Sequence, residues 1–357
     1  MRRSINISKI FLSLILIVLL QAGSWAGSSA DISQIGIGAR PMGMGKAYVA
    51  LADDPSAMFM NPAGIAQIEK PQLLSMQASL LGDINYLTFG GIAPFGPGSI
   101  GLGLVQANVD GITLTELDSN NRPRAVEDVT YYDGIWNLTY ALPITHLARS
   151  AFKMKLPGKL FGGMSLKYFH KGITGYSTGS GTNLDLGLLY IPNSKWRFGI
   201  TQKNAVPSLG VIGSINWDTG AQDYLLSYTT LGVGYYVDPN WLVLVDYDIA
   251  FSGGRKALIH LGTEYTLQKS MVLRTGYEQL HDTTGGNTLG NFTMGLTLYM
   301  EDWKIDYAYH PYYNEVDNTT HFLSFGYRFN EVSIAIFQRQ KDNDEALANV
   351  DEAKESE

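Results

Sequence analysis

Apolar residues recur at every second position through most of the chain after residue 71. In the segment 241–251 (WLVLVDYDIAF) every odd-numbered position is apolar, whereas the even-numbered positions include Asp246 and Asp248. Successive side chains of a β-strand point to opposite faces, so this pattern predicts strands with one apolar face and one face that admits charge. The same split recurs in 257–267 and 303–309. Alternation alone does not separate a membrane barrel from a soluble β-sandwich, because both show it.

The number and length of these segments narrow the choice. Fourteen candidate strands can be drawn, and most have about ten residues, the length that a tilted strand needs to cross a membrane. We therefore predict an all-β fold, a 14-stranded antiparallel transmembrane β-barrel over residues 71–329. The predicted strands are 72–81, 85–93, 98–109, 131–141, 159–170, 182–191, 195–203, 224–237, 241–251, 256–267, 270–280, 290–300, 303–310 and 320–329.

The connections between these segments alternate in length. Five are short turns (PFGPG, PNS, DPN, QK and ED), and between them come longer polar loops at 110–130, 171–181, 204–223, 281–289 and 311–319. Short turns on one side and long loops on the other are typical of an outer-membrane barrel. Two connections break the pattern, because 142–158 is long where a short turn is expected and 252–255 is short where a long loop is expected.

The polar faces of the predicted strands carry charges of both signs. Such residues belong in the lumen, because a charge on the lipid face costs about 2–4 kcal/mol at the membrane midplane. The predicted lumen is therefore hydrated or filled by a polar plug. Its charges are Lys167, Asp185, Arg197, Asp246, Asp248, His260, Glu264, Arg274, Glu278, Lys304, Asp306 and Arg328.

Catalytic and cofactor chemistry finds little support in the sequence. His260 shares a face with Asp246 and Asp248, which is the arrangement of a general base and its orienting carboxylate. However, inward charges on adjacent strands more often form a structural ladder, so we predict no catalytic residues. The six histidines are scattered and predict no metal site. GARPMGMGKA (38–47) departs from the phosphate-binding loop pattern, and no cofactor is predicted.

The two ends of the chain differ from its middle. Residues 1–26 combine three basic residues, an apolar run (IFLSLILIVLL) and small residues, which predicts a signal peptide cleaved after Ala26 or as late as Ala30 rather than a retained anchor. The chain has no cysteine and a net charge of −7, which argues against a lipoprotein and against nucleic-acid binding. Residues 330–357 predict a largely disordered acidic tail. The apolar patch 332–337 within this tail is compatible with a fifteenth barrel strand, a periplasmic strand or an extension of the fourteenth strand.

Residues 31–70 predict a separate unit that precedes the barrel. Asp54-Pro55 and Asn61-Pro62 each place a capping side chain before a proline, which is a signal for the start of a helix. We expect short helices at 56–60 and 63–67, and another at 46–52. Because the unit has too little apolar area to fold alone, we predict that it packs in the lumen as a hatch.

The run GARPMGMGKAYVALADDPSAMFMNPAGIA (38–66) resembles the N-terminal hatch of the FadL superfamily of outer-membrane proteins. In particular it resembles the PorV/PorQ family, whose members share a Gly-Ala-Arg start, a Met-Gly-Met-Gly core, an Ala-Asp-Asp step and an Asn-Pro-Ala-Gly finish. The resemblance implies a 14-stranded barrel with a hatch. The acidic tail departs from the usual ending of such barrels. The matching positions are Gly38, Ala39, Arg40, Gly43, Gly45, Asp53, Asp54, Asn61, Pro62, Ala63 and Gly64.

Two functions follow from this resemblance. The first is a protein-binding component or shuttle in type IX-like secretion, with secretion machinery or cargo proteins as partners. The second is a FadL-like passive transporter of long-chain fatty acids or other hydrophobic compounds. Both place the mature protein in the lipid of the outer membrane, and neither is an enzyme.

Overall fold

The computed structural model describes residues 28–29, 31–80, 83–151, 157–206, 213–250, 255–281, 287–311 and 319–329. The predicted signal peptide, the acidic tail and its patch at 332–337 lie outside the described residues. Within the described residues, no helix has the length and apolar character needed to cross a membrane.

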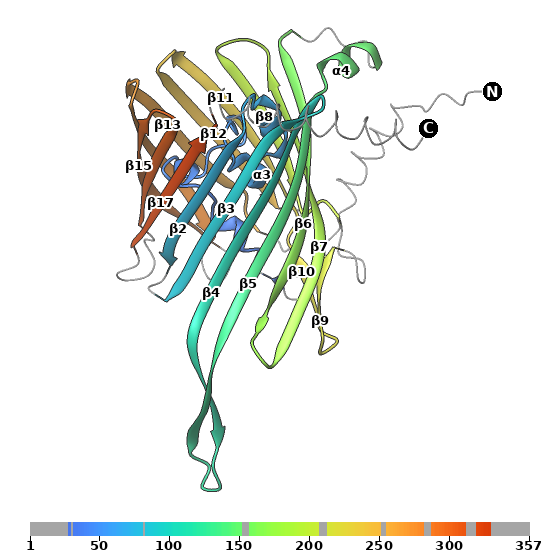
Figure 1. The fold of residues 1–357 in the computed structure, drawn as a ribbon, viewed down its shortest axis with the longest axis vertical. Coiled ribbons are helices and arrows are strands. Elements are labelled where there is room, and N and C mark those ends of the chain that lie inside the picture. The colour runs from blue at the N-terminus through green and yellow to red at the C-terminus, as the bar shows by residue number, and fades with distance from the viewer. Residues whose placement is uncertain are drawn as a thin grey trace, which may run out of the picture.

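Fourteen antiparallel strands form a closed barrel (Figure 1). Each strand pairs with its neighbours in the chain, except where β8 pairs with β11, and the last strand pairs with the first to close the barrel. The prediction of a 14-stranded antiparallel barrel is confirmed. The strands are β2 Gln72–Leu80, β3 Ile84–Phe95, β4 Gly98–Leu117, β5 Pro123–Pro143, β6 Lys159–Ile173, β7 Ser177–Ile191, β8 Trp196–Lys203, β11 Tyr228–Asp238, β12 Trp241–Ala250, β13 Leu258–Gln268, β14 Met271–His281, β15 Thr288–Met300, β16 Trp303–Pro311 and β17 Thr319–Arg328.

The two ends of the barrel differ in height. Short turns join the strands at the upper end in Figure 1, which we call the turn end, and β4 and β5 project far beyond the opposite hairpin end. The predicted loop at 110–130 is therefore wrong, because these two strands run on to Leu117 and from Pro123. Thr113 donates a hydrogen bond to Asp128 across the ladder (2.7 Å), and Asp118 accepts from two backbone amides at the tip.

Two other predicted connections contain regular structure. β6 and β7 extend into 171–181 and leave only a tight turn there. The loop 204–223 contains the short strands β9 (Ser214–Trp217) and β10 (Gln222–Leu225), and β9 pairs with the hairpin end of β7. β1 (Ser28–Ser29) adds to β10 in parallel. The long connection at the turn end holds helix α4 (Thr145–Ala151).

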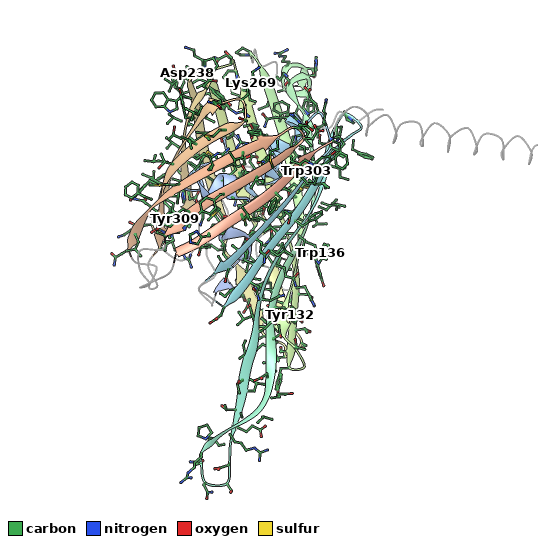
Figure 2. All side chains as sticks on the ribbon, turned by 60° about the vertical axis from the view of Figure 1, so that its left-hand side comes forward. Tyr132, Trp136, Asp238, Lys269, Trp303 and Tyr309 are labelled. Atoms are coloured by element: carbon green, nitrogen blue, oxygen red, sulfur yellow. The ribbon has the colours of Figure 1, made fainter. Side chains whose placement is uncertain are left out.

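The outer surface of the barrel is apolar and the inner surface is polar. Large apolar side chains such as Trp136, Trp303 and Tyr309 are exposed on the outside of the wall (Figure 2). Aromatic pairs gather near the turn end, where the ring centroids of Trp196 and Tyr235 lie 4.6 Å apart. This division of faces is the one that a strand surrounded by lipid requires.

The N-terminal segment, residues 31–70, lies inside the barrel and is almost entirely buried. It contains η1 (Ile32–Gln34), α2 (Ala39–Met42), α3 (Ala57–Met60) and η2 (Pro62–Gln67). The helices expected at 56–60 and 63–67 are present, the second as a 3₁₀ helix. α2 was not predicted, because its four residues form about one turn, contain Pro41 and end at a glycine.

The helix predicted over 46–52 is wrong. Lys46 and Ala52 have positive φ angles (66° and 38°), which an α-helix does not allow. The backbone amides of Tyr48 and Val49 instead donate to the carboxylate of Asp246 on β12, at 2.7 and 2.9 Å. A tertiary partner thus takes the hydrogen bonds that a local helix would have used.

Candidate functional site

Arg40 and Asp53 of the N-terminal segment form the start of an ionic network near the turn end of the lumen. The Arg40 guanidinium donates to both carboxylate oxygens of Glu264 on β13, at 2.8 and 2.9 Å. It also donates to Asp53 at 2.6 Å. The Gly-Ala-Arg and Ala-Asp-Asp motifs are therefore joined to each other and to the barrel wall, with Glu264 as their shared partner.

The network continues through Asp54 and the wall. Lys304 on β16 lies 2.8 Å from Asp54 and 3.2 Å from Asp306, and Arg274 lies 2.6 Å from Glu264. Burial alone would raise the pKa of Asp54, but Lys304 and Arg40 hold the pKa of that carboxyl well below its usual range. Asp54 is therefore a carboxylate inside the barrel.

Of the two predicted capping side chains, Asn61 caps η2, whereas the N-cap residue of α3 is Ser56 and Asp54 binds the turn just before it. Asp54 accepts hydrogen bonds from the backbone N–H and the hydroxyl of Ser56, and Asn61 accepts from the backbone N–H of Ala63 (3.2 Å). The Asn61 amide also donates to the carbonyl oxygens of Val49 and of Leu188 on β7 (2.8 and 3.1 Å). Asn61 thus begins η2 and ties it to the barrel wall.

Glycines allow the N-terminal segment to touch the wall with its backbone. A Cβ atom at Gly276 of β14 would lie 2.1 Å from the backbone nitrogen of Gly45, and one at Gly43 would lie 2.9 Å from the Cα of Gly295 on β15. On the other side of the lumen, a Cβ at Gly163 of β6 would lie 2.4 Å from the backbone nitrogen of Ala63. Side chains at these positions would push the segment out of its place.

A second polar cluster lies deeper, towards the hairpin end. His260 on β13 is within 3.0 Å of the Gly45 carbonyl oxygen through Nδ1, and within 3.2 Å of Asp248 through Nε2. Each ring nitrogen therefore has an acceptor oxygen within hydrogen-bonding distance. Glu278 on β14 pairs with Lys46 at 3.3 Å. His260 and Glu278 thus bind the N-terminal segment to the barrel wall.

Arg197 on β8 also serves the N-terminal segment, by donating to the carbonyl oxygens of Ala50 and Leu51 at 2.9 and 2.8 Å. Lys167 lies in a buried cluster that includes one residue of the segment, Asp31. Its ammonium is 3.1 Å from Asp31 and 2.9 Å from Asp185. Arg328, at the turn end, is exposed.

Sequence reasoning missed Asp31 and Lys203 as members of this cluster. Lys203 pairs with Asp185 at 3.1 Å, and the Asn204 amide donates to Asp31 at 3.2 Å. Burial would raise the pKa of Asp31, but the Lys167 ammonium lowers it to about 2. Lys203 has the inward position of its strand and could have been found by extending the alternation. Asp31 stands among irregular residues, and no sequence pattern marks it.

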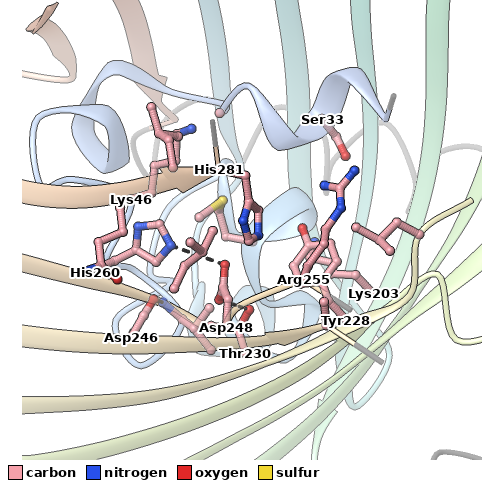
Figure 3. A pocket seen from close by; sticks show the side chains of 18 of the residues that line it. Ser33, Lys46, Lys203, Tyr228, Thr230, Asp246, Asp248, Arg255, His260 and His281 are labelled. Atoms are coloured by element: carbon pink, nitrogen blue, oxygen red, sulfur yellow. Dashed lines mark hydrogen bonds and ion pairs between the residues drawn. The ribbon is translucent and has the colours of Figure 1, made fainter. Parts of the chain in front are cut away.

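The hollows of the barrel include one inside the lumen and one on the outer surface. A pocket of about 330 Å³ lies between the N-terminal segment and β11–β14, towards the hairpin end (Figure 3). An apolar groove of about 790 Å³ lies on the outer surface over β2–β6 and is bordered by Phe89, Leu102 and Trp136. β3 and β4 stay paired behind this groove, where Gly90 faces Gly103.

Met58 and Phe59 pack on the lumen side of the wall behind this outer groove. A Cβ at Gly101 would lie 2.3 Å from the sulfur of Met58, and one at Gly103 would lie 2.3 Å from the ring of Phe59. The groove and the lumen are thus separated only by paired backbone at these glycines. Among the described residues, no group of three or more His, Asp or Glu side chains is placed to hold a metal ion.

Comparison with known proteins shows similarity at the level of the fold. No protein-family model and no curated protein matches the sequence. Among solved structures, the toluene transporter TodX of P. putida is 14% identical, with a TM-score of 0.59 over 83% of this chain and 99% of that chain. The Ralstonia pickettii toluene transporter TbuX is 13% identical, with a TM-score of 0.54 over 83% and 99% of the two chains.

A FadL homologue of Pseudomonas aeruginosa is also similar, with 13% identity and a TM-score of 0.51 over 85% of this chain and the whole of that chain. In each case nearly the whole solved barrel is matched, so the similarity extends over the complete architecture. The barrel described above therefore has the fold of the FadL-type outer-membrane channels.

Proposed function

We propose that this protein is a passive outer-membrane channel for small hydrophobic compounds, with the turn end in the periplasm. The fold supports this proposal, because the similar solved structures include two toluene transporters and a FadL homologue. The apolar outer surface supports the membrane location. Short turns are periplasmic in outer-membrane barrels, which supports the orientation.

The observation that carries the proposal is the position of the N-terminal segment. It is held by the wall of the lumen on several sides, through Glu264, Lys304, Asp246 and the wall glycines. We propose that it acts as a hatch. A water-filled pore of constant width is incompatible with such a filled lumen, whereas a small compound needs only a brief displacement of the segment to pass.

An engineered disulfide tests whether the segment must move. A Cβ at Gly234 on β11 would lie 3.7 Å from the Cβ of Ala50, and disulfides have a Cβ–Cβ distance of about 3.8 Å. Since the chain has no cysteine of its own, the double variant Ala50→Cys/Gly234→Cys forms one defined bridge. We expect uptake of labelled toluene into proteoliposomes to fall at least tenfold after oxidation and to recover after reduction.

The matched controls are the two single variants, Ala50→Cys and Gly234→Cys, which cannot form the bridge within one chain. Uptake by them should not depend on the redox treatment. If the oxidised double variant takes up toluene at the rate of its reduced form, the segment is not a moving hatch. If no variant, including the wild type, accelerates uptake over empty liposomes, the channel function itself is wrong.

A second candidate function is a protein-binding component of type IX-like secretion, as the resemblance to the PorV/PorQ family implies. One structural feature favours it, since the β4–β5 hairpin projects beyond the rest of the barrel. Replacement of 112–128 by a two-residue turn should abolish recovery of secretion proteins in a pull-down from outer membranes. Recovery of the same proteins with the shortened hairpin would count against this role for it.

A further inference from the structure

The pocket on the hairpin side of the N-terminal segment has two chemically different ends. In Figure 3, Asp246, His260 and Lys46 lie on one side, whereas Arg255, Lys203 and Tyr228 lie on the other. Its volume of about 330 Å³ is near the lower limit of the roughly 300–1,000 Å³ found for small-molecule sites. A compact ligand therefore fits it better than a long one.

The two carboxylates at the first of these ends, Asp246 and Asp248, are held mainly by the protein itself. Asp248 accepts from the Thr230 hydroxyl at 2.6 Å and from His260 at 3.2 Å. One oxygen of Asp246 accepts from two backbone amides of the N-terminal segment. The other oxygen of Asp246 has no hydrogen-bond partner among the described residues, but Asp246 is only 1% exposed. This end therefore presents little accessible negative charge to a cationic ligand.

The basic end is different. Lys203 is shared between Asp185 and the Phe59 carbonyl oxygen. Arg255 is half-buried at the mouth of the pocket, and no carboxylate among the described residues forms an ion pair with it. The side chain of Tyr228, which also lines this end, carries a hydroxyl that can donate a hydrogen bond. Arg255 and Tyr228 are more exposed to the pocket than Asp246 is, so a cation and a hydroxyl are the accessible hydrogen-bonding groups at this end, and together they suit an anion.

Apolar side chains also line the pocket, among them Leu226, Ala250, Leu258 and Leu280. A ligand that fills it needs an apolar body as well as an anionic group. Arg255 can bind a carboxylate with two parallel hydrogen bonds, which gives both affinity and orientation. A neutral hydrocarbon would fill the same space and leave the guanidinium without a partner.

We infer that this pocket binds compact organic acids, an aromatic or branched body with one carboxylate, and that Arg255 selects for the carboxylate. The inference rests on the proposed channel function, whose substrate class it specifies. It separates such acids from neutral hydrocarbons by charge, and from long-chain acids by the size of the pocket.

Calorimetric titration of the full-length protein in lipid nanodiscs tests the inference, with benzoate as the probe. Benzyl alcohol is the neutral compound of similar shape, and dodecanoate carries the same carboxylate on a longer chain. We expect benzoate to bind at least tenfold more tightly than either, because a charge-assisted pair contributes about 1.5–3 kcal/mol, or roughly 10- to 100-fold in affinity. Equal binding of benzoate and benzyl alcohol would overturn the inference.

Variants assign the effect to the residue. Arg255→Gln should weaken benzoate at least tenfold and change benzyl alcohol less than twofold, whereas Arg255→Lys should keep most of the preference for the acid. Lys269→Gln removes a cation at the turn end (Figure 2) that does not line the pocket. It should change the affinity for neither benzoate nor benzyl alcohol. Unchanged benzoate affinity in Arg255→Gln would contradict the role of this side chain.

The two proposals fail in different ways. Barrel folding of every variant is checked by the shift in electrophoretic mobility on heating, so that loss of binding is not confused with loss of structure. If benzoate binds as expected but toluene uptake stays at the level of empty liposomes, the channel function fails. If toluene uptake is rapid and benzoate does not bind, only the assignment of the ligand class fails.

Discussion

At the scale of single residues, Arg40 has a defined structural role. It joins two motifs of the N-terminal segment and bonds to Glu264 through two hydrogen bonds. A fork-shaped guanidinium is suited to this task, and a lysine could not bond both oxygens in the same plane. The motif residues that identify the segment are thus residues that hold it in the lumen.

Arg40→Met should lower the free energy of unfolding by about 3 kcal/mol, because Glu264 and Asp53 would each lose an ion pair with the largely buried guanidinium. Chemical denaturation in detergent measures this change. Arg122→Met, at the exposed tip of the β4–β5 hairpin, is the control and should be neutral. A double-mutant cycle with Glu264→Gln should show strong coupling, and purely additive effects would argue against the pair.

Gly45 of the N-terminal segment and Gly96 of the β3–β4 turn form a matched pair that tests the close contact between the segment and the wall. Their φ angles are 59° and 57°, but a Cβ at Gly45 would lie 2.6 Å from the Tyr277 carbonyl oxygen, whereas one at Gly96 meets no atom within 4 Å. Both alanine variants bear a strain of about 1–2 kcal/mol. Gly45→Ala should lose about 2 kcal/mol more through crowding. Equal unfolding midpoints for the two variants would show that the backbone at Tyr277 makes room for the added methyl group at no cost in stability.

At the scale of elements, the strands were predictable and their ends were less so. Period-two alternation marks a strand wherever one face meets lipid and the other meets polar groups, and every predicted strand has its counterpart in the barrel. The extension of β4 and β5 was missed because 110–130 is polar, although residues such as Ile112 and Val129 still face each other across the ladder. Outside the membrane neither face of a strand contacts lipid, so apolar and polar residues no longer need to alternate along it.

The site was predictable as a list of inward charges but not as a set of pairs. Alternation places Glu264 and Lys304 in the lumen, yet nothing in the sequence says that Arg40 and Asp54 are their partners. The failed helix at 46–52 has the same cause, since Asp246 comes from a distant strand. Long-range pairing decides these local structures, and a single sequence does not reveal it.

The tip of the β4–β5 hairpin should depend on Asp118. Its carboxylate accepts from the backbone amides of Asn120 and Arg122, at 2.8 and 2.9 Å. Asp118→Ala should loosen the turn, so that trypsin cleaves after Arg124 several times faster while the barrel keeps its unfolding midpoint. Asp128→Asn keeps a hydrogen-bond acceptor for Thr113 and serves as the control. Unchanged cleavage in Asp118→Ala would show that the ladder alone holds the tip.

At the scale of the whole molecule, acid should release the N-terminal segment. The pKa of Asp31 is lowered from 3.8 to about 2 and that of Asp54 is lowered further. Groups with a depressed pKa contribute stability above pH 4, and this stability is lost as the pH falls from about 4 towards 2. Unfolding midpoints should therefore fall as the pH falls below about 4.

Asp31→Asn should remove a part of this acid dependence, about 2 kcal/mol between pH 5 and pH 2 for a shift of this size. The variant would be less stable than the wild type at pH 7 and closer to it at pH 2. Glu116→Gln, in the exposed part of β4, should leave the profile unchanged. An identical profile for wild type and Asp31→Asn would mean that Asp31 does not contribute to the acid response.

The path of the N-terminal segment sets the order in which this molecule can be assembled. β1 adds to β10 at the hairpin end. At the turn end, the carbonyl oxygen of Ile68 accepts a hydrogen bond from Ser99, which follows the β3–β4 turn. The chain thus passes through the whole lumen before its first wall strand begins. Since β17 closes on β2, a sealed ring could not be threaded afterwards. During biogenesis the sheet must therefore close around a segment that is already in place, and the pairing of β17 with β2 encloses residues 31–70 in the lumen.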